Sequence, residues 1–295
     1  MLPHDADGDP PGLFVVPDGR TVYIWAWEVG LARSGDGGAT WSRLPLPDGH
    51  VEAVAVDPFR PRHLWLQMGS GSPTRIHLYR GADAGSSWRE VSAPGTPVAG
   101  QFVPMPMAAD PEFPGALWIA TDHALFHTVD AGRTWDRVGG GLPPAMPVIG
   151  IAVSLFDGER ILAWRQGTGM YASDDGGRTW RRSTGPFPSG YACHPTFDPL
   201  DHRHIYVACS DGLYVSGNGG RTWARGAGIV GATEVLVSTG HPRLAYLAGW
   251  DVRDGGFLPH GQLFRTTDGG GTWHPWSGGD LLAGDTIQAI AGVVP

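Results

Sequence analysis

The chain has 295 residues, of which 41% are hydrophobic and 10% aromatic, including 13 Trp, so it can bury a substantial core. Only 17% of the residues are charged, and the net charge of −8 counts against nucleic acid as the main partner, because neutralising phosphates requires clustered positive charge. All 21 basic residues are Arg, and the absence of Lys excludes a Schiff-base mechanism.

The first twelve residues, MLPHDADGDPPG, are polar, acidic and rich in Pro. They lack the basic start and the apolar centre of a signal peptide, and no run in the chain is long enough to span a membrane. We therefore expect residues 1–12 to be a flexible N-terminal segment. If Met1 is the natural start, we expect a cytoplasmic protein.

From residue 13 onward, one four-part pattern recurs six times. An apolar run such as VEAVAV (51–56) precedes a run rich in aromatics, a short run such as LYRG (78–81), and an eight-residue phrase that ends in Trp. The last residues of the six phrases are 47, 47, 45, 43 and 50 positions apart. A period in the forties is typical of a propeller or a solenoid, and no apolar period is helical over a useful length.

The six units predict an all-β fold, a six-bladed β-propeller of four-stranded antiparallel blades. We expect a single domain over residues 13–295, with blades at about 13–46, 51–93, 98–139, 147–184, 190–228 and 232–277. The first strand of the first blade, LFVV (13–16), is short. The segment TIQAIAGVV (286–294) is therefore expected to be a closing strand that pairs with the first blade.

The eight-residue phrase is predicted to be a turn between the third and fourth strands of each blade. Its third residue can accept backbone N–H bonds, and its fifth is Gly in all six copies, as expected where φ is positive. Asn218 keeps the acceptor but loses the charge, which indicates a structural rather than a catalytic role. The third residues are Asp36, Asp83, Asp130, Asp175, Asn218 and Asp268, and the phrases end at Trp41, Trp88, Trp135, Trp180, Trp223 and Trp273.

The phrase resembles the Asp-box, or bacterial neuraminidase repeat, S-x-D-x-G-x-T-W. This repeat occurs in sialidases, xyloglucanases, sortilin-type receptors and a photosystem assembly factor. Together with Asp-Pro after the first strand and L-Y-x-S before the phrase, the resemblance covers nearly the whole chain and implies a propeller of the sialidase-like superfamily, within a subgroup of unassigned activity. In that family the boxes lie on the periphery, away from the site.

The resemblance therefore directs attention to the opposite face, where the second-to-third and fourth-to-first loops of the blades meet. The longest of these loops, GWDVRDGGFLPHGQ (249–262), adjoins the first blade if the propeller closes. Aromatic faces beside carboxylates and an Arg suit a sugar or another polar small molecule. The alternative is that the Trp residues pack between blades and the loop is a solvated hairpin. The candidate ligand-binding residues here are Trp27, Trp250 and Arg253, and the candidate catalytic residues are Glu28, Asp251, Asp254 and His260.

A second candidate site lines the central channel at the starts of the first strands. It comprises His50, Glu52, Gln101, His194 and Glu234, whose alternative role is to hydrate the channel. Cys193 and Cys209 fall on neighbouring strands and can be reduced thiols, a disulfide, or part of a metal site with His194. Because adjacent strand residues point to opposite faces, we expect reduced thiols and no metal.

Two classes of function remain. The sialidase assignment fails, because the predicted first strands carry no arginine triad. A xyloglucanase-type enzyme normally uses two propellers around a cleft, and other glycosidase chemistry needs two carboxylates roughly 5–10 Å apart. We expect a module that binds a ligand or a protein partner through the loop face, without a cofactor. The alternative is a hydrolase or lyase that acts on a carbohydrate-like or other polar substrate.

Overall fold

The computed structural model of the protein describes residues 12–15, 21–26, 30–36, 40–57, 60–71, 75–91, 106–120, 124–142, 147–156, 158–165, 167–187, 193–226, 228–237, 243–251, 262–275 and 291–292. Regular structure in these ranges consists of β-strands, and the described residues include no helix. None of them forms a helix that could cross a membrane.

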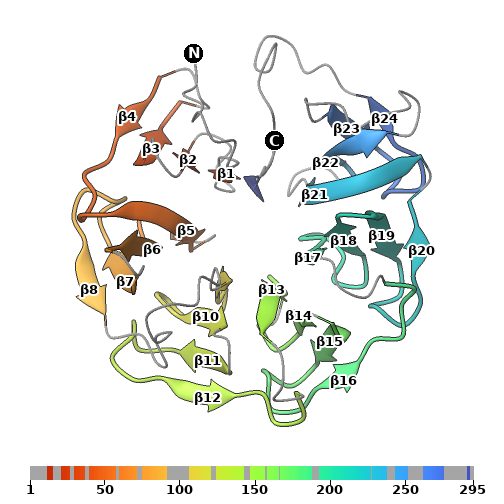
Figure 1. The fold of residues 1–295 in the computed structure, drawn as a ribbon, viewed down its shortest axis with the longest axis horizontal. Helices are drawn as coiled ribbons and strands as arrows, with labels where there is room; N and C mark the ends of the chain where they lie inside the picture. The colour runs from red at the N-terminus through yellow and green to blue at the C-terminus, as the bar shows by residue number, and fades with distance from the viewer. Residues whose placement is uncertain are drawn as a thin grey trace.

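The described strands form six sheets arranged around a common centre (Figure 1). In each sheet four antiparallel strands follow one another from the centre outward. The innermost strands are β1 (Gly12–Val15), β5 (His50–Val56), β9 (Met107–Ala109), β13 (Val148–Val153), β17 (Cys193–Phe197) and β21 (Ile229–Val237). The second strands are β2 (Val22–Ala26), β6 (Leu64–Ser70), β10 (Leu117–Ala120), β14 (Ile161–Arg165), β18 (Ile205–Cys209) and β22 (Ala245–Asp251).

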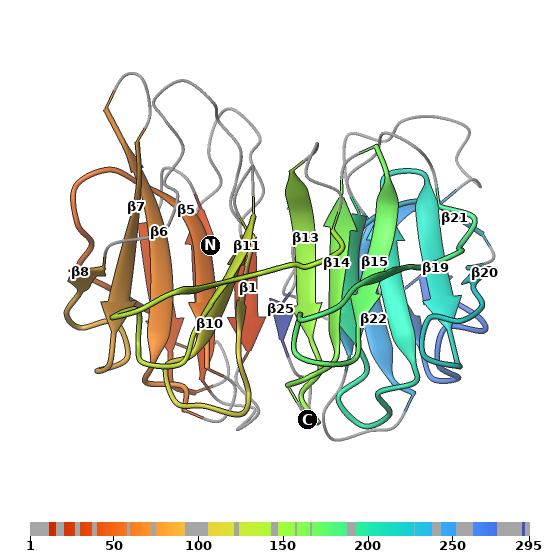
Figure 2. The same cartoon turned by 90° about the horizontal axis from the view of Figure 1, so that it is seen from below.

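The outer half of each sheet is formed by a third strand and a short fourth strand. The third strands are β3 (Gly30–Ser34), β7 (Arg75–Gly81), β11 (Leu125–Thr128), β15 (Gly169–Ser173), β19 (Gly212–Ser216) and β23 (Gln262–Thr266). The fourth strands are β4 (Ser42–Arg43), β8 (Arg89–Val91), β12 (Asp136–Val138), β16 (Arg181–Arg182), β20 (Ala224–Arg225) and β24 (His274–Pro275). The strands run across the thickness of the molecule, so every sheet has one end on each of two faces (Figure 2).

A short strand from the C-terminal segment, β25 (Ala291–Gly292), joins the first sheet. It pairs in parallel with β1, where Phe14 lies opposite Ala291. β25 lies within the expected closing segment 286–294, whose other residues are outside the described ranges. The first sheet therefore has five strands, four from the N-terminal part of the chain and one from the C-terminal segment.

The hydrophobic core lies between neighbouring sheets. One cluster, for example, joins Tyr206 and Leu213 of the β17–β20 sheet to Val235 and Phe264 of the β21–β24 sheet. The second strands are covered on both faces, so all residues of β10, β14 and β18 are buried. This explains their continuous apolar, aromatic-rich sequences, because a strand with one solvated face would alternate apolar and polar residues.

The six phrases fold as hydrogen-bonded turns, here called box turns, between the third and fourth strands. In the box turn 128–135, Asp130 accepts hydrogen bonds from the backbone N–H and the hydroxyl of Thr134, at 2.9 and 2.7 Å, and from the Thr128 hydroxyl at 2.9 Å. These bonds favour the ionised form and lower the pKa of Asp130 to about 2, with the Thr134 hydroxyl as the largest cause. At the equivalent position, Asn218 Oδ1 accepts from the backbone N–H of Thr222 at 2.9 Å. The turn therefore needs the side-chain oxygen and not its charge.

Two consecutive residues of each described box turn have a left-handed backbone. Gly at the fifth position has the expected positive φ, but the fourth position does too, including Ala84 at 63° and Ala131 at 65°. A left-handed conformation costs an L-residue roughly 1–2 kcal/mol. The hydrogen bonds of the Asp side chain across the turn offset this cost. The positive φ values at the fifth position belong to Gly85, Gly132, Gly177, Gly220 and Gly270.

Box turns also contact the preceding sheet. The indole N–H of Trp88 donates to the carbonyl of Pro45 at 2.7 Å, and that of Trp223 donates to the Ser183 hydroxyl at 2.9 Å. Both acceptors follow the fourth strand of the sheet before. The box turns therefore hold neighbouring sheets together as well as turning the chain.

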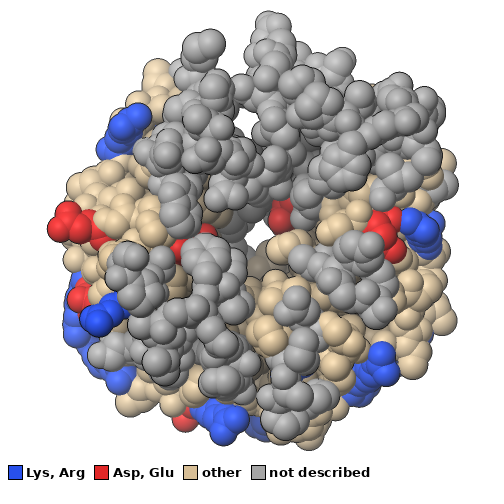
Figure 3. Space-filling model, in the orientation of Figure 1, with Lys and Arg blue, Asp and Glu red and all other residues tan. Residues whose placement is uncertain are grey.

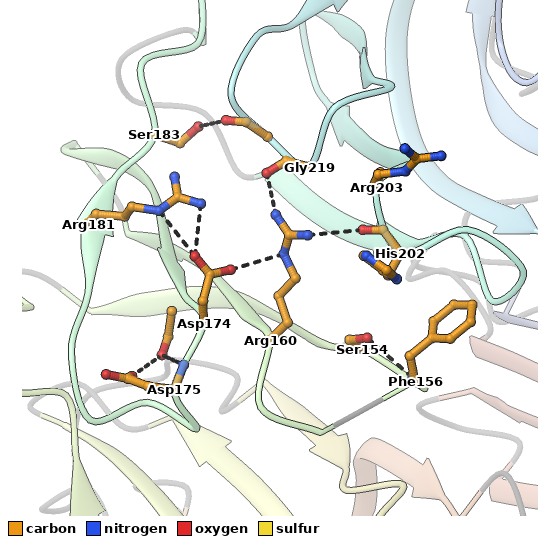
Figure 4. Close-up of polar contacts among 12 residues, drawn as sticks. Ser154, Phe156, Arg160, Asp174, Asp175, Arg181, Ser183, His202, Arg203 and Gly219 are labelled. Carbon is orange, nitrogen blue, oxygen red and sulfur yellow. Dashed lines mark hydrogen bonds and ion pairs between the residues drawn. The ribbon is translucent and has the colours of Figure 1, made fainter.

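A partly buried Arg adds a polar bridge between two sheets (Figure 4). Arg160 precedes β14 and forms an ion pair with Asp174 at 3.3 Å, which also pairs with Arg181 at 3.2 Å. The same guanidinium donates to the carbonyl of Gly219 in the next box turn and to that of His202 at 3.4 Å. One side chain thus joins the β13–β16 sheet to the β17–β20 sheet.

The expectation of reduced thiols is wrong, because Cys193 and Cys209 form a disulfide. They lie directly opposite each other on β17 and β18, with Cα atoms 4.3 Å apart. Both side chains are fully buried between sheets. The strand register indicated that they are neighbours, but residue types alone could not distinguish two buried thiols from a bond.

The close packing of a box turn on the preceding sheet can be tested with two glycines. An added Cβ on Gly132 would overlap Val91 and lie 3.1 Å from Trp65, whereas one on Gly176 would meet no atom within 4 Å. Both residues have positive φ, at 79° and 67°. We expect Gly176→Ala to lower the free energy of unfolding by about 1 kcal/mol, for the backbone alone, and Gly132→Ala to lower it by at least about twice as much.

Denaturant titration of the two variants measures both losses. Equal losses would show that the packing of Gly132 contributes nothing beyond its backbone conformation.

Candidate functional site

The box turns and the starts of the innermost strands lie on opposite faces. Four of the described box turns are hydrogen-bonded to the turn between the first and second strands of their own sheet. The bonds are Ala84 N to Arg62 O at 2.9 Å, Gly176 N to Glu159 O at 2.8 Å, Gly219 N to Arg203 O at 2.7 Å and Gly269 N to Arg243 O at 3.0 Å. One face is therefore occupied by structural turns, and the candidate site belongs to the other face and the central opening (Figure 3).

His50 and Glu52 form a hydrogen-bonded pair at the start of β5. Their Nε2 and Oε1 atoms are 2.7 Å apart. The register between β5 and β6 shifts between Val51 and Ala53, so Glu52 is the extra residue of a β-bulge. The Glu52 side chain is 4% exposed and that of His50 is 20% exposed. The bulge thus buries a carboxylate behind an imidazole that reaches solvent.

Glu234 and His194 lie at equivalent positions of neighbouring innermost strands. Glu234 pairs with Ala248 of β22, and His194 pairs with Ala208 of β18. In both sheets the pairing continues from the second strand to a residue of the third strand. That residue lies three positions before the first residue of the box turn. Burial raises the pKa of Glu234 to about 8, so this carboxyl group is largely protonated near neutral pH. His194 is exposed.

The same position in two other sheets carries small residues. Ala53 pairs with Gln67 of β6, and Gly150 pairs with Trp164 of β14. At Gly150 the missing side chain allows the close approach of the next innermost strand, because an added Cβ would overlap the Cys193 carbonyl. At this level the innermost strands provide one carboxyl group and one imidazole. Such a lining can hydrogen-bond a polar, uncharged ligand.

Several predicted site residues fall outside the described part of the chain. Trp250 and Asp251 belong to β22, and Trp250 pairs with Gly231, but their side chains are not described. The predicted approach of Trp27 to Trp250 stays a prediction. The candidates outside the described ranges are Trp27, Glu28, Gln101, Arg253, Asp254 and His260.

Two residues near this face were missed by the sequence reasoning. Arg165 ends β14 and is only 3% exposed, and burial lowers the pKa of its guanidinium. Its position directly after the apolar run ILAW could have marked it as a candidate in the sequence, because a charged residue at the end of a buried strand is unusual. Gly69 of β6 lies opposite His50, and no pattern in the sequence distinguishes it from the other glycines.

A metal centre finds no support in the described ranges. They contain no group of three or more His, Cys, Asp or Glu side chains that could hold a metal ion. Cys193, once considered with His194, is bonded to Cys209.

The raised pKa of Glu234 predicts a pH dependence of stability. The folded protein keeps this proton up to about pH 8, whereas the unfolded chain releases it near pH 4.5, so between these values folding binds a proton and stability falls as the pH rises. We expect Glu234→Gln to remove this loss: its melting temperature should match the wild type near pH 4.5 and exceed it at pH 8 and above. Glu90→Gln, at an exposed position, is the control. Parallel melting curves of wild type and Glu234→Gln across this range would contradict the assignment.

Comparison with known proteins agrees with this geometry. A model of the BNR/Asp-box repeat matches residues 264–275, which include the last box turn. The chain is 24% identical over 302 residues to the xyloglucanase Xgh74A of Acetivibrio thermocellus, a match that covers 90% of this chain and 31% of that protein. It is 30% identical over 168 residues to a xyloglucanase of Hypocrea jecorina, covering 55% of this chain and 18% of that protein. The chain thus spans a third or less of the length of these curated relatives.

Solved structures show the same fold. The crystal structure of the GH74 xyloglucanase from Xanthomonas campestris matches 92% of this chain and 45% of its own, with a TM-score of 0.72 and 20% identity. A structure described as YCF48 bound to D1 peptide matches 92% of this chain and 85% of its own, with a TM-score of 0.59 and 17% identity. With antiparallel four-stranded sheets, box turns and these neighbours, the BNR/Asp-box repeat family of β-propellers fits this chain.

Proposed function

We propose that this protein is a hydrolase that acts on a glucan-type polysaccharide at the central opening. The observation that carries the proposal is the similarity to Xgh74A, which extends over 90% of this chain. A hydrolase was the alternative reading of the sequence, and the xyloglucanase relatives favour it over the binding module that we expected first.

The chemistry of the opening supports the same proposal. Glycoside hydrolysis uses one carboxylic acid that is still protonated near neutral pH and a second, ionised carboxylate. Glu234, with its pKa near 8, suits the first role. Glu28, Asp251 and Asp254 remain the candidates for the second.

We also propose that the six sheets are the blades of one closed propeller over residues 13–295. The parallel pairing of β25 with β1 supports closure, because it brings the C-terminal segment onto the first sheet. Closure would place the loop after β22 next to the first sheet, as the sequence pattern implies. The cytoplasmic location stays a prediction, and a disulfide is more typical of oxidising compartments.

The second candidate function is binding without turnover, to a carbohydrate or to a protein partner, through the same face. The observation that favours it is the length of the match. Because this chain aligns with 31% of Xgh74A, the activity of that whole enzyme does not transfer with the alignment.

Turnover of xyloglucan, measured as released reducing ends, tests the proposal. We expect Glu234→Gln to lower kcat by about 100-fold or more, the usual contribution of a general acid. Asp130→Asn, in a box turn on the opposite face, should leave kcat unchanged. Glu28→Ala and Asp251→Ala test the second carboxylate.

Three outcomes separate the candidates. Activity that survives in all three site variants would remove the proposed site. Activity lost in Asp130→Asn without a lower melting temperature would show that the box turns are more than structural. Saturable binding of xyloglucan without release of reducing ends would favour the binding module.

A further inference from the structure

The pair formed by His50 and Glu52 is the most completely built polar site among the described residues of the opening. Burying a carboxylate such as that of Glu52 is costly unless it is hydrogen-bonded or paired. The 2.7 Å contact with His50 Nε2 meets part of this cost, and the bulge in β5 provides the geometry. Replacing such a pair by apolar residues of similar volume is often neutral or stabilising, so packing alone does not require it.

The neighbouring strand leaves space for this pair. An added Cβ on Gly69 would overlap both His50 Nε2 and Glu52 Oε1. Gly69 is not among the residues with positive φ, so Gly is not required there by the backbone. Gly49, directly before His50, does need positive φ, at 126°, and an added Cβ there would overlap the Gly69 carbonyl. Both glycines thus keep the side-chain pair in place, one by its backbone and one by its missing side chain.

The two side chains of the pair differ in their exposure to solvent. The Glu52 carboxylate accepts the hydrogen bond from Nε2–H, which fixes the tautomer and the orientation of the imidazole. Glu52 is almost completely buried, whereas a fifth of the His50 side chain is exposed. A ligand in the opening therefore meets the imidazole, and the carboxylate lies behind it.

We propose that His50 contacts a hydroxyl group of the saccharide bound at the opening and that Glu52 is its positioning residue. This inference rests on the proposed function and assigns to this chain a recognition element for a neutral, polyhydroxylated ligand. A hydroxyl group both donates and accepts hydrogen bonds, which matches an oriented imidazole better than a charged ligand does.

Gly69→Ala provides a sharp test, because it displaces the pair while keeping both of its residues. The atoms that the new methyl group meets are the ends of flexible side chains, so the melting temperature should change little. The matched control is Gly217→Ala in a box turn on the opposite face, where an added Cβ meets nothing within 4 Å. Calorimetric titration with a xyloglucan oligosaccharide gives the dissociation constant of each variant.

We expect Gly69→Ala and His50→Ala to weaken binding at least tenfold and Gly217→Ala to bind as the wild type does. Glu52→Gln, which retains an oxygen acceptor, should lose less affinity than Glu52→Ala. A direct reading comes from diethylpyrocarbonate modification, in which the saccharide should protect His50 but not the distant His202 of the opposite face.

Wild-type affinity in both Gly69→Ala and His50→Ala would overturn the inference while leaving the proposed function in place. Equal modification of His50 with and without the saccharide would overturn it as well. Failure of the wild-type protein to bind or cleave xyloglucan would instead overturn the proposed function, and the inference with it.

Discussion

The hydrogen bonds of one Asp or Asn side chain across five residues of a turn are the interaction on which the rest of this fold depends. In the box turn 128–135 the Asp130 carboxylate accepts from the backbone and the hydroxyl of Thr134, and so holds two consecutive residues in a left-handed conformation. That conformation lets a glycine lie against an aromatic side chain of the preceding sheet and lets the following Trp start the fourth strand. Because Asn218 performs the same role, the constraint is geometric and does not depend on a charge.

This constraint also determines where chemistry can occur. The box turns and the turns that bond to them occupy one face, and both sides of the second strands are buried. The candidate polar side chains lie on the innermost strands and in the loops of the other face. There the strands are irregular, because β5, β13 and β21 each contain a bulge. The irregular part of the molecule is thus carried by a scaffold whose opposite face is formed by regular turns.

The sequence predicted the repeated parts of the fold because repetition makes a local signal unambiguous. Trp88, Trp135 and their equivalents fixed the number of units, and the aromatic runs marked the buried second strands. The bulge that brings Glu52 to His50 left no such signal, because one inserted residue in a strand does not alter its composition. Nor could the sequence show that Arg160 reaches the carbonyl of Gly219, 59 residues away. The left-handed Ala131 was hidden for another reason: the side chain of a different residue, Asp130, stabilises a conformation that Ala alone disfavours.

The site was less predictable than the fold, because its properties depend on tertiary contacts that leave no repeated signal in the sequence. His50, Glu52, His194 and Glu234 were recognised as residues at strand starts, but the raised pKa of Glu234 depends on burial, which is a tertiary property. The strand register correctly set Cys193 beside Cys209, while the bond between them is a matter of geometry and redox environment.

The contacts between sheets have a direction along the chain. Trp88 binds Pro45, Trp223 binds Ser183 and Gly270 approaches Tyr206, so these three box turns contact residues that precede them in the sequence. On a ribosome, every newly made sheet would therefore meet a partner that has already been synthesised. Assembly can proceed one sheet at a time from the N-terminus, without waiting for residues still to come, until the C-terminal segment reaches the first sheet.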